Sequence, residues 1–178
     1  MNLTKARIRN LTGIKIKVAS LLKQALGNSI DIDPKSGAIR FSSNILFNQG
    51  EYELKAGSKE ELKGVLYKYI NTLFSNPEIK KHIESIVIEG HTNSDGEYIY
   101  NLELSQKRAL EVMKFLFSLD FNNSMELKKY VSASGKSYSN IIMRNGREDR
   151  DASRRIEIKF RIKNDKAIEE LDKFISNN

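Results

Sequence analysis

The sequence contains no cysteine among its 178 residues, so it can form neither disulfides nor thiolate metal sites. Long hydrophobic runs are also missing: every apolar stretch is far too short to cross a bilayer, and the charges in residues 1–9 are not followed by the apolar segment of a signal peptide. There is no internal repeat and no low-complexity tract. With 39% hydrophobic and 30% charged residues, the composition is that of an ordinary soluble protein with one domain and extensions.

Acidic side chains are missing from residues 1–28, whose six basic side chains account for most of the net charge of +7. The remainder is close to neutral, so we expect no groove for nucleic acid. Apolar residues recur at helical spacing from Leu11 to Ala25, and Gly27 offers a C-cap. We therefore expect residues 1–28 to form a basic amphipathic linker helix. Packing on its own domain or on a second copy is favoured over a membrane surface, because Gly13 interrupts the pattern and the apolar face lacks aromatics.

Residues 29–163 show the alternation of strand and helix patterns that is typical of a layered α/β domain. The segment 155–162 alternates polar and apolar residues, which predicts a strand whose sheet has one uncovered face. Residues 134–153 are polar and are expected to be a loop with at most a short helix. The other predicted elements are a hairpin over 30–41, strands over 44–47, 85–89 and 129–133, a helix behind a capping box of Ser58 and Glu61, a helix over 97–119, and a final helix over 164–178.

Several patterns that resemble catalytic or metal motifs fail on inspection. Ser134-Gly-Lys-Ser137 lacks the earlier glycine of a phosphate-binding loop, since that position is Tyr130, and a turn is expected instead. His82 and His91 lack the partners of a zinc site, and no Gly-x-Ser-x-Gly elbow supports a Ser/His/Asp triad. His91 is interpreted as a structural residue that satisfies backbone groups at a strand end, and residues 148–151 as a solvated charged loop. We expect no enzyme activity, cofactor or metal.

The loop 91–96 remains as a candidate binding site, because it joins a strand to the start of a long helix. Free N–H groups at a helix start attract anions, and Asn101, Leu104 and Arg108 lie on the helix face that leads back to the loop. Arg108 suits a carboxylate, and Asp95 with Asn93 suits a neighbouring ammonium, as in an amino-acid head group. Alternatively, Arg108 only ties the loop down by bonding its carbonyls. The residues alone favour neither interpretation.

The segments 88–96, 101–109, 146–147 and 153–158 resemble, in order, the GHTD, NxxLSxxRA and GR…NRRVEI motifs of the OmpA-like peptidoglycan-binding domain. The resemblance covers roughly residues 40–162. It implies a βαβαβ two-layer sandwich with helices on one face of a mixed sheet, here with extra N- and C-terminal helices, spanning 29–163. It also implies non-catalytic binding of the peptidoglycan stem peptide, commonly through diaminopimelate. The ligand-binding residues that it implies are Asn93, Arg108 and Arg154, with Thr92, Asn101 and Leu104 around them, and Asp95 is added to this expected site by the charge argument above.

The chain departs from the family pattern at Asn93, where an aspartate is usual. An amide cannot neutralise an ammonium, so we hypothesise that Asp95 compensates; a domain that kept the fold but lost the ligand and serves as a protein-interaction or dimerisation domain is the alternative. The flanking helices resemble the wall-anchoring part of MotB-type stator subunits, including the ZorB component of the Zorya anti-phage system. This implies a homodimer in the periplasm, a membrane motor or transport partner, and a chain that is a fragment whose upstream membrane helix is missing.

Overall fold

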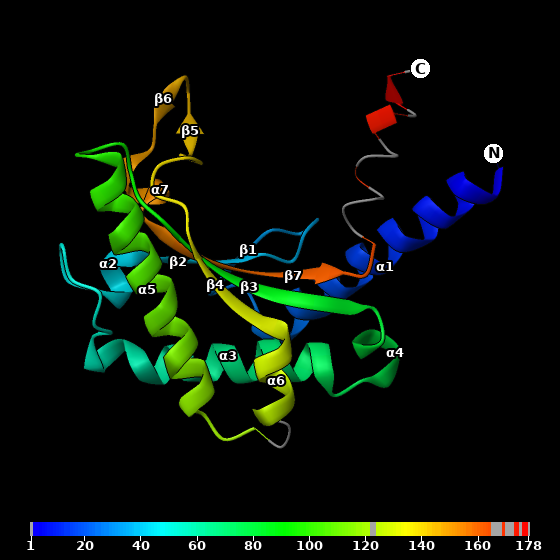
Figure 1. The fold of residues 1–178 in the computed structure, drawn as a ribbon. Coiled ribbons are helices and arrows are strands. Elements are labelled where there is room, and N and C mark those ends of the chain that lie inside the picture. Colours follow the sequence, from blue (N-terminus) through cyan, green and yellow to red (C-terminus); the bar gives the residue numbers. More distant parts are fainter. Residues whose placement is uncertain (1, 122–123, 165–168, 170–172, 175, 178) are drawn as a thin grey trace.

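The protein is built on a five-stranded mixed sheet (Figure 1). This computed structural model describes residues 2–121, 124–164, 169, 173–174 and 176–177. Strand β3 pairs in parallel with β4, whereas all other neighbouring strands pair antiparallel, and the order is β1-β2-β7-β3-β4. The predicted α/β class with a mixed sheet is confirmed. The strands of this sheet are β1 (Asp31–Ile32), β2 (Ile39–Ser42), β3 (Ile83–His91), β4 (Val131–Gly135) and β7 (Arg155–Ile162).

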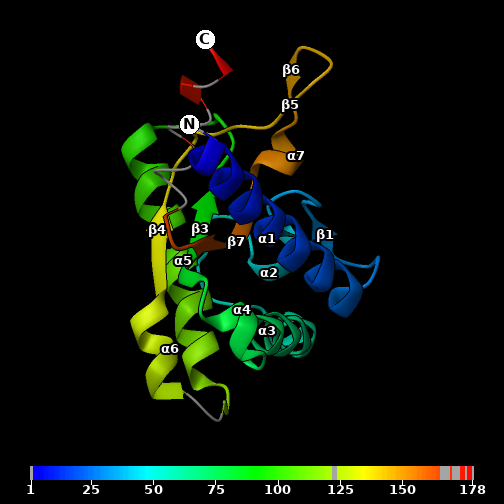
Figure 2. The ribbon, with the colours of Figure 1, turned by 90° about the vertical axis from the view of Figure 1, so that its right-hand side faces the viewer.

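Helices α3 and α5 cover one face of the sheet (Figures 1 and 2). Helix α5 (Tyr98–Ser118) packs on β3 and β4, and helix α3 (Lys59–Phe74) packs against α1 (Asn2–Leu26). Their apolar sides meet those of β7 and β3 in a single core that includes Leu66, Ile86, Val112 and Ile158. The helices are α1 (Asn2–Leu26), α2 (Ser43–Leu46), α3 (Lys59–Phe74), α4 (Pro77–Lys80), α5 (Tyr98–Ser118), α6 (Ser124–Tyr130) and α7 (Arg150–Ser153), with a 3-10 turn η1 (Ala56–Ser58).

Two glycines let helix α5 lie directly on the sheet. A Cβ atom added to Gly90 would stand 2.1 Å from the carbonyl oxygen of Ser105, and one added to Gly135 would stand 2.5 Å from the backbone nitrogen of Gln106. These backbone contacts fix the height of α5 above β3 and β4. The start of α5 and the loop before it are thereby held at the end of the central strands.

Three local predictions are wrong, and one helix was not predicted. Residues 44–47 form the turn of helix α2 and its cap rather than a strand. Ser58 does not cap α3 with its side chain, because the preceding 3-10 turn directs its Oγ to the carbonyl of Lys55. Helix α6 was not expected. The segment 134–153 contains the hairpin β5 (Met143–Arg144) and β6 (Arg147–Glu148) and the helix α7, rather than a loop.

Helix α1 is longer than the pattern from Leu11 to Ala25 and ends as expected. Gly27 has φ 74° and donates its N–H to Lys23 at 3.0 Å, which is a glycine C-cap. Val18 and Leu22 are buried in the shared core, so the expectation that this helix packs on its own domain is confirmed. The expected helix over 164–178 falls largely outside the described residues. Among those that the structure describes, no helix combines the length and apolar character needed to span a membrane.

Candidate ligand-binding site

The loop 92–97 is fixed at one end by the turn that follows β4 and at the other by a side chain of α5. Thr92 donates its N–H to the carbonyl of Ser137 at 2.9 Å, and its hydroxyl bonds the carbonyl of Asn93. The amide of Asn101 donates to the carbonyls of Asp95 at 2.7 Å and Glu97 at 3.1 Å. Thr92 and Asn101 are both buried. These two side chains therefore hold the loop in shape. Because they are buried, they are not accessible to a ligand.

Asn93 and Asp95 face each other across the loop. The Nδ2 of Asn93 donates to the carboxylate of Asp95 at 3.2 Å, and the Asp95 N–H donates back to Oδ1 at 3.0 Å. Arg150 of helix α7 forms an ion pair with the same carboxylate at 3.0 Å. The carboxylate of Asp95 thus already has a cationic partner from within the chain.

The hairpin β5–β6 is hydrogen-bonded to this loop. Glu148 accepts hydrogen bonds from the N–H of Ser94 at 2.9 Å and from the Ser94 hydroxyl. Asp149 caps α7 by accepting from the N–H of Ala152 at 3.0 Å. The interpretation of residues 148–151 as a loop is wrong, because Glu148 belongs to β6 and Arg150 and Asp151 belong to α7. Arg150 and Asp151 are exposed, as expected, but Glu148 and Arg150 also bind the loop 92–97. A charge run alone does not reveal partners 54 residues away.

Arg108 is buried, with 6% of its surface exposed. Its Nε donates to the carbonyl of Glu51 at 2.8 Å, its Nη2 donates to that of Asn48 at 3.2 Å, and its guanidinium lies over the ring of Phe47. Burial lowers the pKa of Arg108 from its ordinary value, against the opposing effect of Tyr100. The guanidinium does tie down a loop, as the alternative proposed, but that loop is 48–51 and not 91–96.

An open cavity of about 730 Å³ lies between the loop 92–97 and the hairpin. Asn93, Asp95 and Arg154 line it together, whereas Leu104 and Arg108 are not among its lining residues. Arg154 pairs with Asp151, and its Nε is buried without an acceptor among the described residues. The charge of Arg154 is close enough to Arg108 to contribute to lowering its pKa. The structure therefore brings three of the expected residues to one cavity and sets Arg108 beside it.

His91 belongs to an ion network on the other face of the sheet. Its Nε2 lies 3.1 Å from Glu89 and 3.9 Å from Glu157. The ammonium of Lys159 lies between these carboxylates, at 2.8 Å and 3.2 Å. Two acids and a histidine could ligate a metal, but Lys159 and Arg155 already balance both acids. The interpretation that His91 satisfies backbone groups is therefore replaced by a role in this ion network.

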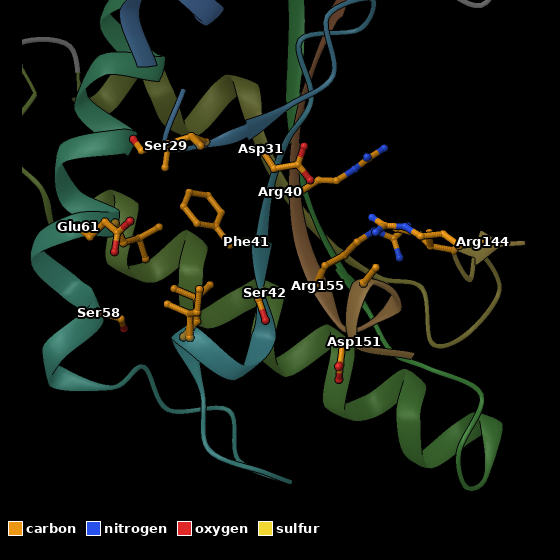
Figure 3. Close-up of a pocket in the computed structure, with 16 residues that line it drawn as sticks. Ser29, Asp31, Arg40, Phe41, Ser42, Ser58, Glu61, Arg144, Asp151 and Arg155 are labelled. Carbon is orange, nitrogen blue, oxygen red and sulfur yellow. The ribbon is translucent and has the colours of Figure 1, made fainter. Parts of the chain in front are cut away.

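The sheet face that was expected to be uncovered is closed only at one end: Arg155 and Glu157 are 4% and 2% exposed, whereas Arg161 at the other end of β7 is exposed. A second cavity, of about 320 Å³, lies beside Arg155 between β2 and α3, with Phe41 pointing into it (Figure 3). Arg155 lines this cavity, but its Nε binds Glu157 at 2.7 Å and its Nη atoms bind the carbonyls of Ser153 and Asn140. A buried guanidinium with a hydrogen bond on each of its three nitrogens is structural.

The profile of the OmpA family matches residues 46–155 of this chain. The chain belongs to the OmpA family. It is 30% identical over 157 residues to the Zorya protein ZorB of Escherichia coli O139:H28, a match that covers 81% of this chain and 61% of ZorB. The chain thus spans about three fifths of the length of that relative.

Two solved structures show the same fold. The periplasmic domain of Helicobacter pylori MotB superposes with a TM-score of 0.56 at 21% identity, covering 83% of this chain and 89% of that one. The cell wall anchor of the type VI secretion system from Pseudomonas aeruginosa gives a TM-score of 0.56 at 18% identity, covering 81% and 96%. OmpA-like domains of this type are non-catalytic binding domains, in agreement with the expectation that this chain is not an enzyme.

Proposed function

We propose that this domain binds peptidoglycan non-covalently through the stem peptide and anchors a membrane complex to the cell wall. Membership of the OmpA family supports this function, and so does the fold shared with a cell wall anchor and with a MotB periplasmic domain. The site supports it as well, because the loop 92–97, the hairpin β5–β6 and helix α7 meet around an open cavity with charges of both signs.

The place of Arg154 in the lining of the open cavity is the observation that carries the proposal. Its side chain is 35% exposed and its ion pair with Asp151 is at the surface, so a ligand carboxylate can take the place of Asp151 at a cost of about 0–1 kcal/mol. A carboxylate bound there would also lie beside the positive charge of Arg108. Arg154 and Arg108 then act together on one acidic group of the stem peptide.

The ammonium of a diaminopimelate residue would bind at Asp95. Asn93 accepts a hydrogen bond but carries no charge, so Asp95 supplies the negative charge in its place. The ligand has to share or displace Arg150, whose ion pair with Asp95 is exposed and therefore costs little to open, about 0–1 kcal/mol. Diaminopimelate thus remains the head group that this arrangement fits best.

The test is a titration of a soluble diaminopimelate-containing stem peptide, monitored by calorimetry. Arg154→Gln is expected to weaken binding by about 10-fold or more, and Asp95→Asn by about 5-fold or more, because each loses a charge-assisted hydrogen bond. Arg161→Gln, at an exposed position on β7 outside the site, is the control and should bind normally. Unchanged affinity in the Arg154 variant would end the proposal, and unchanged affinity in the Asp95 variant would end the compensation by Asp95.

A protein-interaction or dimerisation domain with weak or lost wall binding is the second candidate. Two observations favour it: Arg108 is committed to the loop 48–51, and Asp95 is already paired with Arg150. Co-sedimentation with purified sacculi separates the two functions, since a binding domain pellets with the wall and an interaction domain stays in the supernatant.

We further propose the setting of a MotB- or ZorB-type stator. In that setting the domain lies in the periplasm, pairs with a second copy, and is joined upstream to a membrane helix and a membrane partner. The similarity to ZorB supports a role in anti-phage defence. Sedimentation equilibrium of the chain tests the dimer, and a monomer at all accessible concentrations would contradict it.

A further inference from the structure

Two consecutive residues of helix α7 pair with charged groups of opposite sign in the open cavity. The guanidinium of Arg150 lies 3.0 Å from one carboxylate oxygen of Asp95 and 3.3 Å from the other. The carboxylate of Asp151, the next residue, pairs with Nη2 of Arg154. All four side chains line the cavity of about 730 Å³. Each of the two charges that the proposed ligand would use therefore already has a partner within the chain.

Arg150 and Asp151 together carry the charges of a zwitterion. The cation of Arg150 lies where the proposed function puts the ammonium of the ligand, and the anion of Asp151 lies where it puts the carboxylate. Their Cα atoms are about 3.8 Å apart, so both charges come from one short stretch, as they do in an amino-acid head group. The ligand and these two side chains thus compete for the same two partners.

The backbone of α7 is held firmly, whereas these two side chains are free to move away. Asp149 caps the helix with its side chain, and the hydroxyl of Ser153 accepts from the N–H of Ile142 at 2.9 Å. The side chains of Arg150 and Asp151 are 62% and 83% exposed. Water solvates them when they rotate out, so a ligand can displace both without unfolding the helix. An exposed ion pair of this kind changes an equilibrium by up to about 5-fold.

We propose that Arg150 and Asp151 form a built-in competitor that occupies the ligand-binding cavity of the free domain. This inference rests on the proposed function, because the ligand must use Asp95 and Arg154. A ligand with one charged group only exchanges one ion pair for another and gains little. A ligand with both groups replaces both partners, and its second contact forms within the complex at high effective concentration. The competitor therefore favours a zwitterionic head group over simple amines and carboxylates.

The experiment is a calorimetric titration of the diaminopimelate-containing stem tripeptide into the unmodified chain and its variants. Arg150→Gln and Asp151→Asn should each bind about 2- to 5-fold more tightly, because one internal partner no longer has to be displaced. The double variant should gain more than either, and Arg150→Lys, which keeps the charge, should gain least. Arg147→Gln on the hairpin and Glu103→Gln on the exposed side of α5 change the net charge equally and are the controls.

A second ligand shows which charge each residue replaces. This ligand is the same tripeptide with the side-chain ammonium of diaminopimelate acetylated. Arg150→Gln should lose its gain with this ligand, because Asp95 then has no ammonium to receive. Asp151→Asn should keep its gain, because the carboxylate of the ligand is unchanged. Equal gains of the two variants with both ligands would overturn the proposal, since the effect would then be one of net charge.

The remaining outcomes separate the competitor from the function on which it rests. If the unmodified chain binds the tripeptide and the two single variants bind it equally or more weakly, the competitor is overturned and the proposed function stands. A gain in only one of them also overturns a competitor that acts on both charges. Binding that is detected only in the variants supports it. Absence of binding in every variant and in the unmodified chain overturns both proposals.

Discussion

Asn93 stands where an aspartate is usual in the OmpA family. The amide in place of a carboxylate changes the charge balance of the whole loop. Its Nδ2 donates to Asp95, and Arg150 completes the neutralisation of that carboxylate. The loop is thus satisfied without a ligand. An aspartate at the same position would put two carboxylates together and would need a cation from outside.

Asn93→Asp is therefore expected to destabilise the free protein. The oxygen that replaces Nδ2 would stand 3.2 Å from an oxygen of Asp95, so two negative charges repel at a buried position. The expected loss is about 1–2 kcal/mol at pH 7, measured by urea denaturation. A bound ammonium should reverse much of it, so the stem peptide should stabilise this variant more than the unmodified protein. Asn145→Asp, at the exposed end of the hairpin, is the control; equal stability of the two variants would contradict the prediction.

At the scale of the elements, long periodic patterns predict well and short ones do not. The alternation of residues 155–162 and the amphipathic spacing of 59–74 and 98–118 identify β7, α3 and α5 because each buries a continuous face. The run 44–47 is too short to show any period. Its helical turn depends on a contact with the segment just before β7, because the N–H of Ser43 donates to the carbonyl of Arg154. Burial of Arg155 and Glu157 likewise depends on partners from other strands, such as Arg40.

The close contact of β3 with α5 predicts a large effect of Gly90→Ala. The new methyl would overlap the backbone of Ser105, which has no freedom to move aside, so α5 must shift with Arg108 and Asn101. We expect a loss of about 1–3 kcal/mol or more in the free energy of unfolding and weaker wall binding. Gly64→Ala, in the exposed middle of α3 with open space around it, should gain about 0.5–1 kcal/mol. Similar values for the two variants would show that the contact is not tight.

The ion network between β3 and β7 predicts that the stability of the fold depends on pH. Burial alone would raise the pKa of Glu157, but Arg155 and Lys159 outweigh it and lower this pKa to about 2 from 4.5. Glu157 therefore stabilises the fold above pH 4.5, and this contribution is lost as the pH falls toward 2. Glu157→Gln should be less stable by about 1–3 kcal/mol at pH 7, with the gap closing over that range. The control is Glu84→Gln, exposed on β3, and a constant gap in urea titrations would contradict the assignment.

At the scale of the whole molecule, the sequence predicts the site only in part because the site is assembled from distant segments. The loop 92–97 and the start of α5 are contiguous, so their proximity was predictable. The contacts of Arg108 with residues 48–51 join positions 57 to 60 residues apart, and those of Glu148 and Arg150 with the loop join positions 54 and 55 apart. Such contacts follow from the topology of the sheet and leave no local pattern.

The packing of α1 decides whether the basic segment is a flexible linker or part of the domain. Leu22 is fully buried, and α1 packs on α3. If the helix is integral, Leu22→Ala should lower the free energy of unfolding by about 2–5 kcal/mol, because it leaves a cavity in the shared core. Ile16→Ala, at a half-exposed position on the same helix, should change it by less than about 0.5 kcal/mol. A linker that is only loosely attached would give small and equal effects in urea denaturation. A large effect at Leu22 alone means that a force applied to α1 acts on the same core that positions the loop 92–97.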